Sequence, residues 1–250
     1  MKRVRLDTLL VQRRLAASRE RARAMILAGQ VRIDGTPSAK AGALVPVDRE
    51  ITLITPDHPY VGRGGVKLAH ALETFGISVQ GKETLDIGAS TGGFTDVLLQ
   101  RGAAHVVALD VGHGQLDWRL RNDPRVVTLE RVNARSIHPD RLPSTLQHFD
   151  IVTIDVSFIS LKLIVPVVPT LLNPGADVLA LVKPQFEAGR AEVSKKGLIH
   201  DPAVHARVVD EVSTAAHKVG LTPVAVTPSP ITGMEGNREF FLHLRASTEV

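Results

Sequence analysis

Short hydrophobic runs alternate with longer segments of helical spacing over the last three quarters of the chain. Five runs are rich in β-branched and aliphatic side chains and have the length of buried strands. They lie at residues 84–87, 106–109, 126–129, 151–154 and 178–182. Helical spacing is found at residues 93–101, 161–172 and 203–219, and two late strands are predicted at 224–226 and 239–244. This alternation predicts an α/β fold, with helices on both faces of a mostly parallel sheet.

The first quarter of the chain has a different pattern, in which two short helices precede two strands. Leucines recur at near-helical spacing over residues 6–15, and Ser18 can cap a second helix that Gly29 ends. The strands are predicted at residues 30–33 and 50–54, and Asp34-Gly35 predicts a tight turn after the first of them. These elements predict a small α+β domain.

A change in composition near residue 57 separates the two patterns. Proline and polar residues at 55–59 end the first unit, and a glycine-rich stretch at 62–65 opens the second. We therefore predict a first domain over residues 1–57, a linker over 58–63 and a second domain over 64–250.

Composition narrows the class of protein. Hydrophobic residues make up 44% of the chain and charged residues 22%, which is usual for a folded, water-soluble protein. The apolar stretches are too broken for a membrane span and the first residues do not read as a signal peptide, so we expect a cytoplasmic location. The absence of cysteine excludes disulfides, thiolate zinc sites and thiol nucleophiles, and we expect no metal in the site.

The positive charge is concentrated at the front of the chain. Residues 1–60 hold 11 basic and 6 acidic side chains, whereas the other 190 residues hold 19 and 20. Such an excess in one small domain is typical of a nucleic-acid-binding module.

The turn after the first strand of the second domain has the composition of a cofactor loop. Residues 86–95 read Asp-Ile-Gly-Ala-Ser-Thr-Gly-Gly-Phe-Thr, and glycines at a strand-to-helix turn let a ligand approach the backbone. A nicotinamide dinucleotide would favour Gly-x-Gly-x-x-Gly, but the middle position is Ser90. Asp86 would repel a pyrophosphate, whereas it suits the cationic amino-acid end of S-adenosylmethionine. The loop therefore favours S-adenosylmethionine.

The predicted cofactor contacts come from this loop and from the next two strand ends. They are Asp86, Gly88, Ser90, Gly92, Gly93, Phe94, Asp110 and Asn133. Asp110 can accept hydrogen bonds from both hydroxyls of a ribose. Asn133 is a candidate for the adenine edge and equally a turn residue.

Four charged residues are placed to act on a ribose hydroxyl. Methyl transfer to a 2′-hydroxyl needs the oxygen aligned with the methyl group and a partner for its proton, and a lysine made less basic by burial or nearby cations is a natural partner. The candidates are Lys67, Asp155, Lys183 and Glu239, all before or at the ends of predicted strands. Taken singly, each is as readily a capping or surface group.

Motifs in both parts of the chain resemble known families. Two basic helices followed by Gly29, Val31 and Asp34-Gly35 resemble the RNA-binding domain of the ribosomal protein S four type. The second domain resembles the TlyA or hemolysin A family of rRNA 2′-O-methyltransferases and, more distantly, the FtsJ-like enzymes. The matching segments are residues 62–68, 86–95, 110–116, 155–160, 182–187 and 236–241.

This resemblance implies a Rossmann-like methyltransferase domain that uses S-adenosylmethionine. Its Lys-Asp-Lys-Glu catalytic set maps onto the four charged candidates. It also implies a cytidine ribose of 16S or 23S rRNA, or both, as substrate. The expected partners are therefore rRNA or ribosomal subunits, with no obligatory protein partner evident. In the first domain, the residues expected to contact RNA phosphates are Arg5, Arg13, Arg19 and Arg23.

Other functions and one further segment enter the predictions. The main alternative is an RNA-binding ribosome-assembly factor that keeps the methyltransferase fold without turnover. Membrane lysis is suggested only by the family's older name, and the chain lacks a predicted membrane span. The hydrophilic segment 189–197, bounded by glycines, is predicted either as a flap that brings Lys195 and Lys196 to RNA phosphates or as a surface loop.

Overall fold

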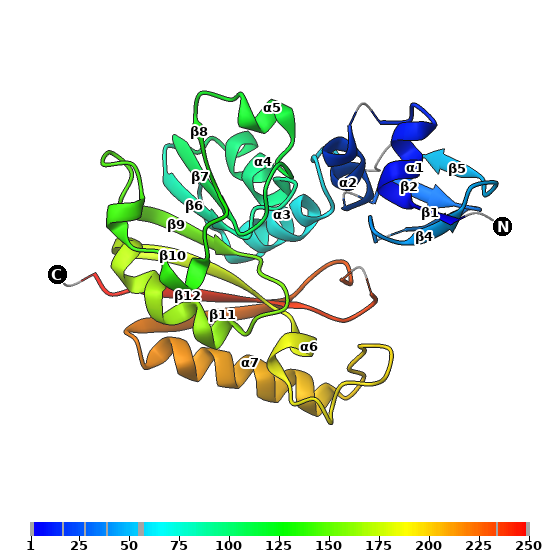
Figure 1. Ribbon diagram of the computed structural model, residues 1–250. Coiled ribbons are helices and arrows are strands. Elements are labelled where there is room, and N and C mark those ends of the chain that lie inside the picture. Colours follow the sequence, from blue (N-terminus) through cyan, green and yellow to red (C-terminus); the bar gives the residue numbers. More distant parts are fainter. Residues whose placement is uncertain are drawn as a thin grey trace.

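The computed structural model describes residues 3–16, 18–27, 29–38, 40–54, 58–233 and 235–248. Within these residues the chain forms two units, each with its own hydrophobic core (Figure 1). Residues 55–57, on which the predicted domain boundary falls, lie outside the described residues.

The first unit consists of two helices packed on short antiparallel strands. Its elements are β1 (Arg3–Arg5), α1 (Leu6–Gln12), α2 (Arg19–Leu27), β2 (Val31–Ile33), β3 (Thr36–Pro37), β4 (Leu44–Pro46) and β5 (Ile51–Leu53). β1 pairs with β4, and β2 lies between β3 and β5. The predicted cap is confirmed, since Ser18 Oγ accepts a hydrogen bond of 3.2 Å from the Arg21 amide. Asp34 and Gly35, with φ of 47° and 78°, form the predicted turn.

The second unit is built on a seven-stranded sheet in the order β11-β12-β10-β9-β6-β7-β8. The strands are β6 (Glu83–Ile87), β7 (His105–Asp110), β8 (Val126–Glu130), β9 (Phe149–Ile154), β10 (Leu172–Val182), β11 (Leu221–Pro228) and β12 (Phe240–Ala246). β12 is antiparallel to both of its neighbours, and the strands from β10 to β8 are parallel. The predicted α/β class and mostly parallel sheet are confirmed.

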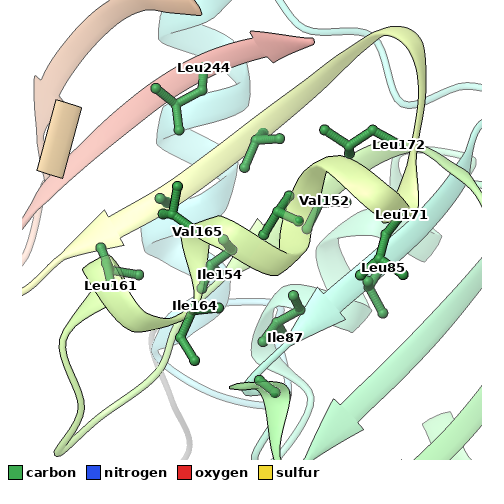
Figure 2. Close-up of a cluster of buried hydrophobic side chains, with 14 of the residues drawn as sticks. Leu85, Ile87, Val152, Ile154, Leu161, Ile164, Val165, Leu171, Leu172 and Leu244 are labelled. Carbon is green, nitrogen blue, oxygen red and sulfur yellow. The ribbon is translucent and has the colours of Figure 1, made fainter. Parts of the chain in front are cut away.

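Helices cover both faces of this sheet. One face carries α3 (Gly64–Phe75), α4 (Gly93–Gln100) and α5 (Trp118–Arg121). The other carries α7 (Pro202–His217) and the 3₁₀ helices η1 (Ala134–Ser136), η2 (Pro139–Arg141), η3 (Leu161–Leu163) and η4 (Val165–Leu171). Figure 2 shows the core of this second face, where Leu85, Ile87, Val152 and Ile154 of the strands meet Leu161, Ile164 and Val165. A short helix, α6 (Pro184–Glu187), follows β10.

The helix predicted over residues 161–172 is wrong in type and extent. The segment forms η3 and η4, and β10 already begins at Leu172. Pro166 and Pro169 lack amide donors and restrict the residues before them, which prevents a regular α-helix. The early start of β10 is hidden in the sequence by Pro174 and Gly175, which lie at an irregularity in its pairing with β9.

The two units contact each other through charged side chains. Arg21 of α2 forms an ion pair of 2.9 Å with Asp117, the residue that caps α5. Lys40 lies 3.6 Å from Glu235. The first unit is thereby placed beside the edge of the sheet at which the parallel strands end (Figure 1).

Candidate active site

The loop between β6 and α4 lies at the switch point of the sheet, between β6 and β9. Gly88, Ser90 and Gly92 have positive φ, so the backbone turns sharply before α4 begins at Gly93. A Cβ atom on Gly88 would lie 2.4 Å from the carbonyl oxygen of Asp155. Glycine at this position therefore allows the cofactor loop to pack against the residue that follows β9.

The four predicted catalytic residues converge as two ion pairs. Lys183 Nζ lies 2.5 Å from Asp155 Oδ1, and Lys67 Nζ donates a hydrogen bond of 2.6 Å to Glu239 Oε2. Asp155 and Lys183 follow adjacent parallel strands. Glu239 joins them because β12 runs antiparallel, so its start lies at the edge where β10 ends. The predicted grouping of these residues is therefore present in the fold.

Burial shapes the electrostatics of these pairs. Lys67, Lys183 and Glu239 are each less than 10% exposed. Burial alone would raise the pKa of Asp155, but the charges of Lys183 and Lys67 outweigh it and hold that pKa below its ordinary value of 3.8. Asp155 is therefore ionised at neutral pH and fixes the Lys183 ammonium. Lys183 also donates a hydrogen bond of 2.9 Å to Ser157 Oγ.

These pairs open into a cavity of about 450 Å³, a size usual for small-molecule sites. The second unit lines it with the cofactor loop, the four predicted catalytic residues and the segments after β9 and β10. Leu27 and Lys40 of the first unit also line it. The arrangement can hold a small cofactor on the loop and present a second substrate to Lys183.

Asp86 lies apart from the cavity that the cofactor loop lines. Its side chain is fully buried and does not line the cavity. Its two carboxylate oxygens accept hydrogen bonds from Thr95 Oγ1 at 2.7 Å and Thr153 Oγ1 at 3.0 Å. Asp86 precedes the strand end by one residue, so its side chain points toward α4 rather than into the crevice. It supports the loop from below, and its contact with the amino-acid end of a cofactor stays a prediction.

Replacing Asp86 with asparagine should change how stability depends on pH. Burial raises the pKa of Asp86 from 3.8 to about 7, so the folded protein holds a proton that the unfolded chain releases above pH 4. Stability of the parent should therefore fall as pH rises from about 4 to 7. Denaturant unfolding of both proteins at pH 5 and pH 8 should show that the free energy of unfolding of the variant rises relative to that of the parent, by about 2.5 kcal/mol between the two pH values. The same difference in unfolding free energy between variant and parent at both pH values would contradict this prediction.

Asp110 and Asn133 lie outside the cavity lining, at the ends of β7 and β8. Asp110 accepts hydrogen bonds from the Ser90 amide at 2.8 Å and the Gly112 amide at 2.6 Å, so it ties the cofactor loop to the next strand end. Asn133 caps η1 by accepting a hydrogen bond from the Arg135 amide, which is the turn role considered for it. Contacts of these residues with ribose and adenine stay predictions.

Replacing Asp110 with alanine should weaken binding of S-adenosylmethionine by about 1.5–3 kcal/mol, the range for hydrogen bonds to a charged group. The loss would combine a ribose contact with release of the Ser90 amide. Titration calorimetry measures it directly. Unchanged affinity would remove Asp110 from the cofactor site.

The arginines predicted to contact RNA are unequally available. Arg5 and Arg19 both bond to the buried carboxylate of Asp7, at 2.7 and 3.4 Å. Arg13 donates a hydrogen bond of 2.6 Å to the Val47 carbonyl. Arg23 is exposed on α2. Arg21, on the opposite side of this helix, contacts the second unit instead.

Lys195 and Lys196 are exposed and do not line the cavity. Their segment is tied at both ends. Glu192 forms an ion pair of 2.6 Å with Arg207, and Asn237 Nδ2 donates a hydrogen bond of 2.8 Å to the Gly197 carbonyl. Closure of the segment over RNA would have to break these contacts.

Phe158, to which the sequence analysis assigned no role, is a further candidate site residue. Its side chain is 91% exposed at the cavity, and its backbone has a φ of 65°, which is rare for an aromatic residue. Its ring lies 5.1 Å from that of Phe186. An exposed ring at a cavity mouth can stack on a nucleobase. Phe158 belongs to the family-like segment 155–160, but the local sequence does not reveal that its ring is exposed to solvent.

Comparison with protein families agrees with this geometry. The FtsJ-like methyltransferase family model matches residues 60–246, and the S4 domain model matches residues 4–51. The chain belongs to the FtsJ-like methyltransferase family. The predicted resemblance is thus confirmed for both parts of the chain.

Relatives of this FtsJ-like chain match over nearly its whole length. A Mycobacterium tuberculosis protein named 16S/23S rRNA (cytidine-2′-O)-methyltransferase TlyA is 49% identical, covering 99% of this chain and 92% of that one. The solved structure of a Streptococcus thermophilus protein described as a hemolysin has a TM-score of 0.76 at 42% identity, covering 99% and 90%. An S-adenosylmethionine-dependent methyltransferase from Mesorhizobium loti shares the fold alone, with a TM-score of 0.54 at 16% identity, covering 70% and 96%.

In the parts of this FtsJ-like chain that the structure describes, no helix combines the length and apolar character needed to cross a membrane.

Proposed function

We propose that this chain transfers a methyl group from S-adenosylmethionine to the 2′-hydroxyl of a cytidine in ribosomal RNA. The observation that carries the proposal is the meeting of two buried lysine–carboxylate pairs in a cavity beside the cofactor loop. The naming of the M. tuberculosis relative supports rRNA and cytidine as the substrate. The proposed partner is rRNA or a ribosomal subunit, and the proposed location is the cytoplasm.

The cofactor loop fits S-adenosylmethionine, since its glycines leave the backbone open to a ligand and its acidic residue is buried beneath it. Bound S-adenosylmethionine supplies an electrophilic methyl group. Lys183 acts once its ammonium has released a proton to solvent: the neutral amine accepts a hydrogen bond from the 2′-hydroxyl and takes its proton as the oxygen is methylated. Asp155 and Ser157 fix the orientation of Lys183. Glu239 holds Lys67, whose charge lowers the pKa of Asp155.

Phe158 is proposed to stack on the target base after this base has left the RNA helix. A ribose within a duplex is shielded from an enclosed catalytic group, so the nucleotide has to leave the stack. A ring that is almost fully exposed beside Lys183 and Ser157 provides a surface for that base.

The alternative is an RNA-binding assembly factor without turnover. Such a protein has no use for two buried ion pairs in an open cavity, because each buried charge is costly to desolvate. The intact pairs therefore favour an enzyme.

The experiment is methylation of ribosomal subunits and free rRNA that lack the modification, with labelled S-adenosylmethionine. Nucleoside mass spectrometry should find 2′-O-methylcytidine, and primer extension should locate it. Methyl transfer to a base would refute the 2′-hydroxyl. RNA binding without any transfer would favour the assembly factor.

Replacing Lys195 and Lys196 together with alanine should weaken RNA binding and flatten its salt dependence, because each phosphate contact releases counterions. Affinity for S-adenosylmethionine should not change, since neither residue lines the cavity. Binding measured from 50 to 200 mM salt tests this. An unchanged slope would identify the segment as a surface loop.

A further inference from the structure

The segment after β10 and the segment after β9 are joined by side-chain contacts along their length. Lys183 contacts Asp155 and Ser157, and the ring of Phe186 contacts that of Phe158. The catalytic lysine and the exposed phenylalanine thus depend on the same pair of segments. A contact that fixes the spacing of these two segments therefore also fixes the distance between Lys183 and the ring of Phe158.

Glu187 makes a further contact between the two segments, and this residue has no role in the proton transfer proposed for Lys183. Its side chain is 9% exposed. One carboxylate oxygen accepts a hydrogen bond of 2.5 Å from Ser160 Oγ, and the other accepts one of 2.7 Å from the Leu161 amide. Both partners lie just beyond Phe158. A buried carboxylate with two charge-assisted hydrogen bonds is a strong anchor for a short loop.

The loop needs such an anchor because its conformation is unfavourable by itself. A φ of 65° at Phe158 costs free energy, on the order of 1–3 kcal/mol, and an exposed aromatic ring gains no burial in return. Without the bonds to Ser160 and Leu161, the backbone could relax to negative φ. The ring of Phe158 would then turn away from its present place over the cavity.

We propose that Glu187 is a positioning residue that holds Phe158 in its exposed conformation for stacking on the target base. This proposal rests on the proposed function and explains how the chain positions the target nucleotide for methyl transfer. Glu187 acts through the loop and touches neither the hydroxyl nor the methyl donor. Its removal should therefore impair use of RNA and leave cofactor binding unchanged.

The test is a double-mutant cycle in the full chain, read as kcat/KM for RNA. Stacking is worth about 1–3 kcal/mol per base, so Phe158→Ala should lower kcat/KM by roughly 5- to 150-fold. Glu187→Ala should cause a loss of similar size. The double variant should fall at most about threefold below the Phe158→Ala variant, because both changes remove the same contact.

Two further variants separate positioning from general damage. Glu187→Gln should retain activity within about threefold, because its amide can accept from the Leu161 amide and donate to Ser160 Oγ. Glu211→Ala is the matched control, since Glu211 bonds to Lys162 at 2.8 Å, on the other side of η3, and should leave activity unchanged. If Glu187→Ala does not fold, the same cycle is run with Ser160→Ala, which removes one of the two hydrogen bonds to Glu187 together with the bond from the Lys162 amide that caps η3.

The outcomes are distinguishable. If the losses from Glu187→Ala and Phe158→Ala multiply, or if Glu187→Ala also weakens S-adenosylmethionine binding, Glu187 is a structural residue and the inference is overturned. If the parent protein transfers no methyl group to RNA, the proposed function and this inference fall together. A non-multiplicative cycle in an active parent supports both.

Discussion

Replacing Lys183 with alanine is expected to abolish methyl transfer while S-adenosylmethionine binding and the fold are nearly retained. Lys183 is buried at the end of β10, 2.5 Å from Asp155 and 2.9 Å from Ser157, and lines the cavity beside the cofactor loop. Pro184 restricts its backbone and so holds the side chain toward the crevice. The loss should be confined to the transition state, with single-turnover rates reduced to background. Lys82→Ala, at the opposite end of β6, is the control.

Lys183→Arg decides how Lys183 acts. A guanidinium cannot release its proton near neutral pH, so this variant should also fail if Lys183 is the base. The parent single-turnover rate should rise with pH, whereas a residual rate in the variant should stay flat. The competing view is that alignment alone suffices, with Lys183 only holding the hydroxyl. Substantial activity of Lys183→Arg would establish that view.

Removing the first domain is expected to eliminate rRNA methylation and preserve cofactor binding. A fragment of residues 58–250 keeps both cores of the methyltransferase domain, including the contacts of Tyr60 and Val61. It loses the basic helices and also Leu27 and Lys40 from the cavity lining. Titration calorimetry and methylation of subunits measure the two properties. Full rRNA methylation by the fragment would contradict the prediction.

A point variant separates RNA binding from docking of the domains. Arg21→Ala in the full chain breaks the ion pair with Asp117 but keeps the other arginines of α2. The Asp117 amide donates a hydrogen bond of 3.1 Å to the Thr91 carbonyl in the cofactor loop. If Arg21→Ala weakens cofactor binding, docking of the first domain stabilises that loop. If it does not, the domain acts on RNA alone.

The sequence was sufficient where the deciding forces are local. Hydrophobic runs of strand length located all seven strands of the large sheet, and helical spacing located α4 and α7 but not α3, α5 or α6. Glycine, serine and aspartate marked turns and caps. Sequence periodicity was not sufficient at residues 161–172, where aliphatic spacing predicts an α-helix but Pro166 and Pro169 prevent one. Motif likeness singled out Lys67, Asp155, Lys183 and Glu239 as the catalytic candidates, and the fold brings them together.

Only the tertiary structure decided which of these side chains meet and which face the cavity. Asp86 and Asp155 are both carboxylates near the ends of adjacent strands, but Asp86 is level with Thr153 inside the sheet, whereas Asp155 lies two residues farther on, beyond the end of β9. Asp86 is therefore buried beneath the loop, and Asp155 lines the cavity. Lys67 and Glu239 are 172 residues apart and pair because β12 runs antiparallel. The exposure of Phe158 and the anchoring by Glu187 likewise depend on contacts between segments. A sequence records local preference, whereas register, strand direction and burial are set when distant segments pack.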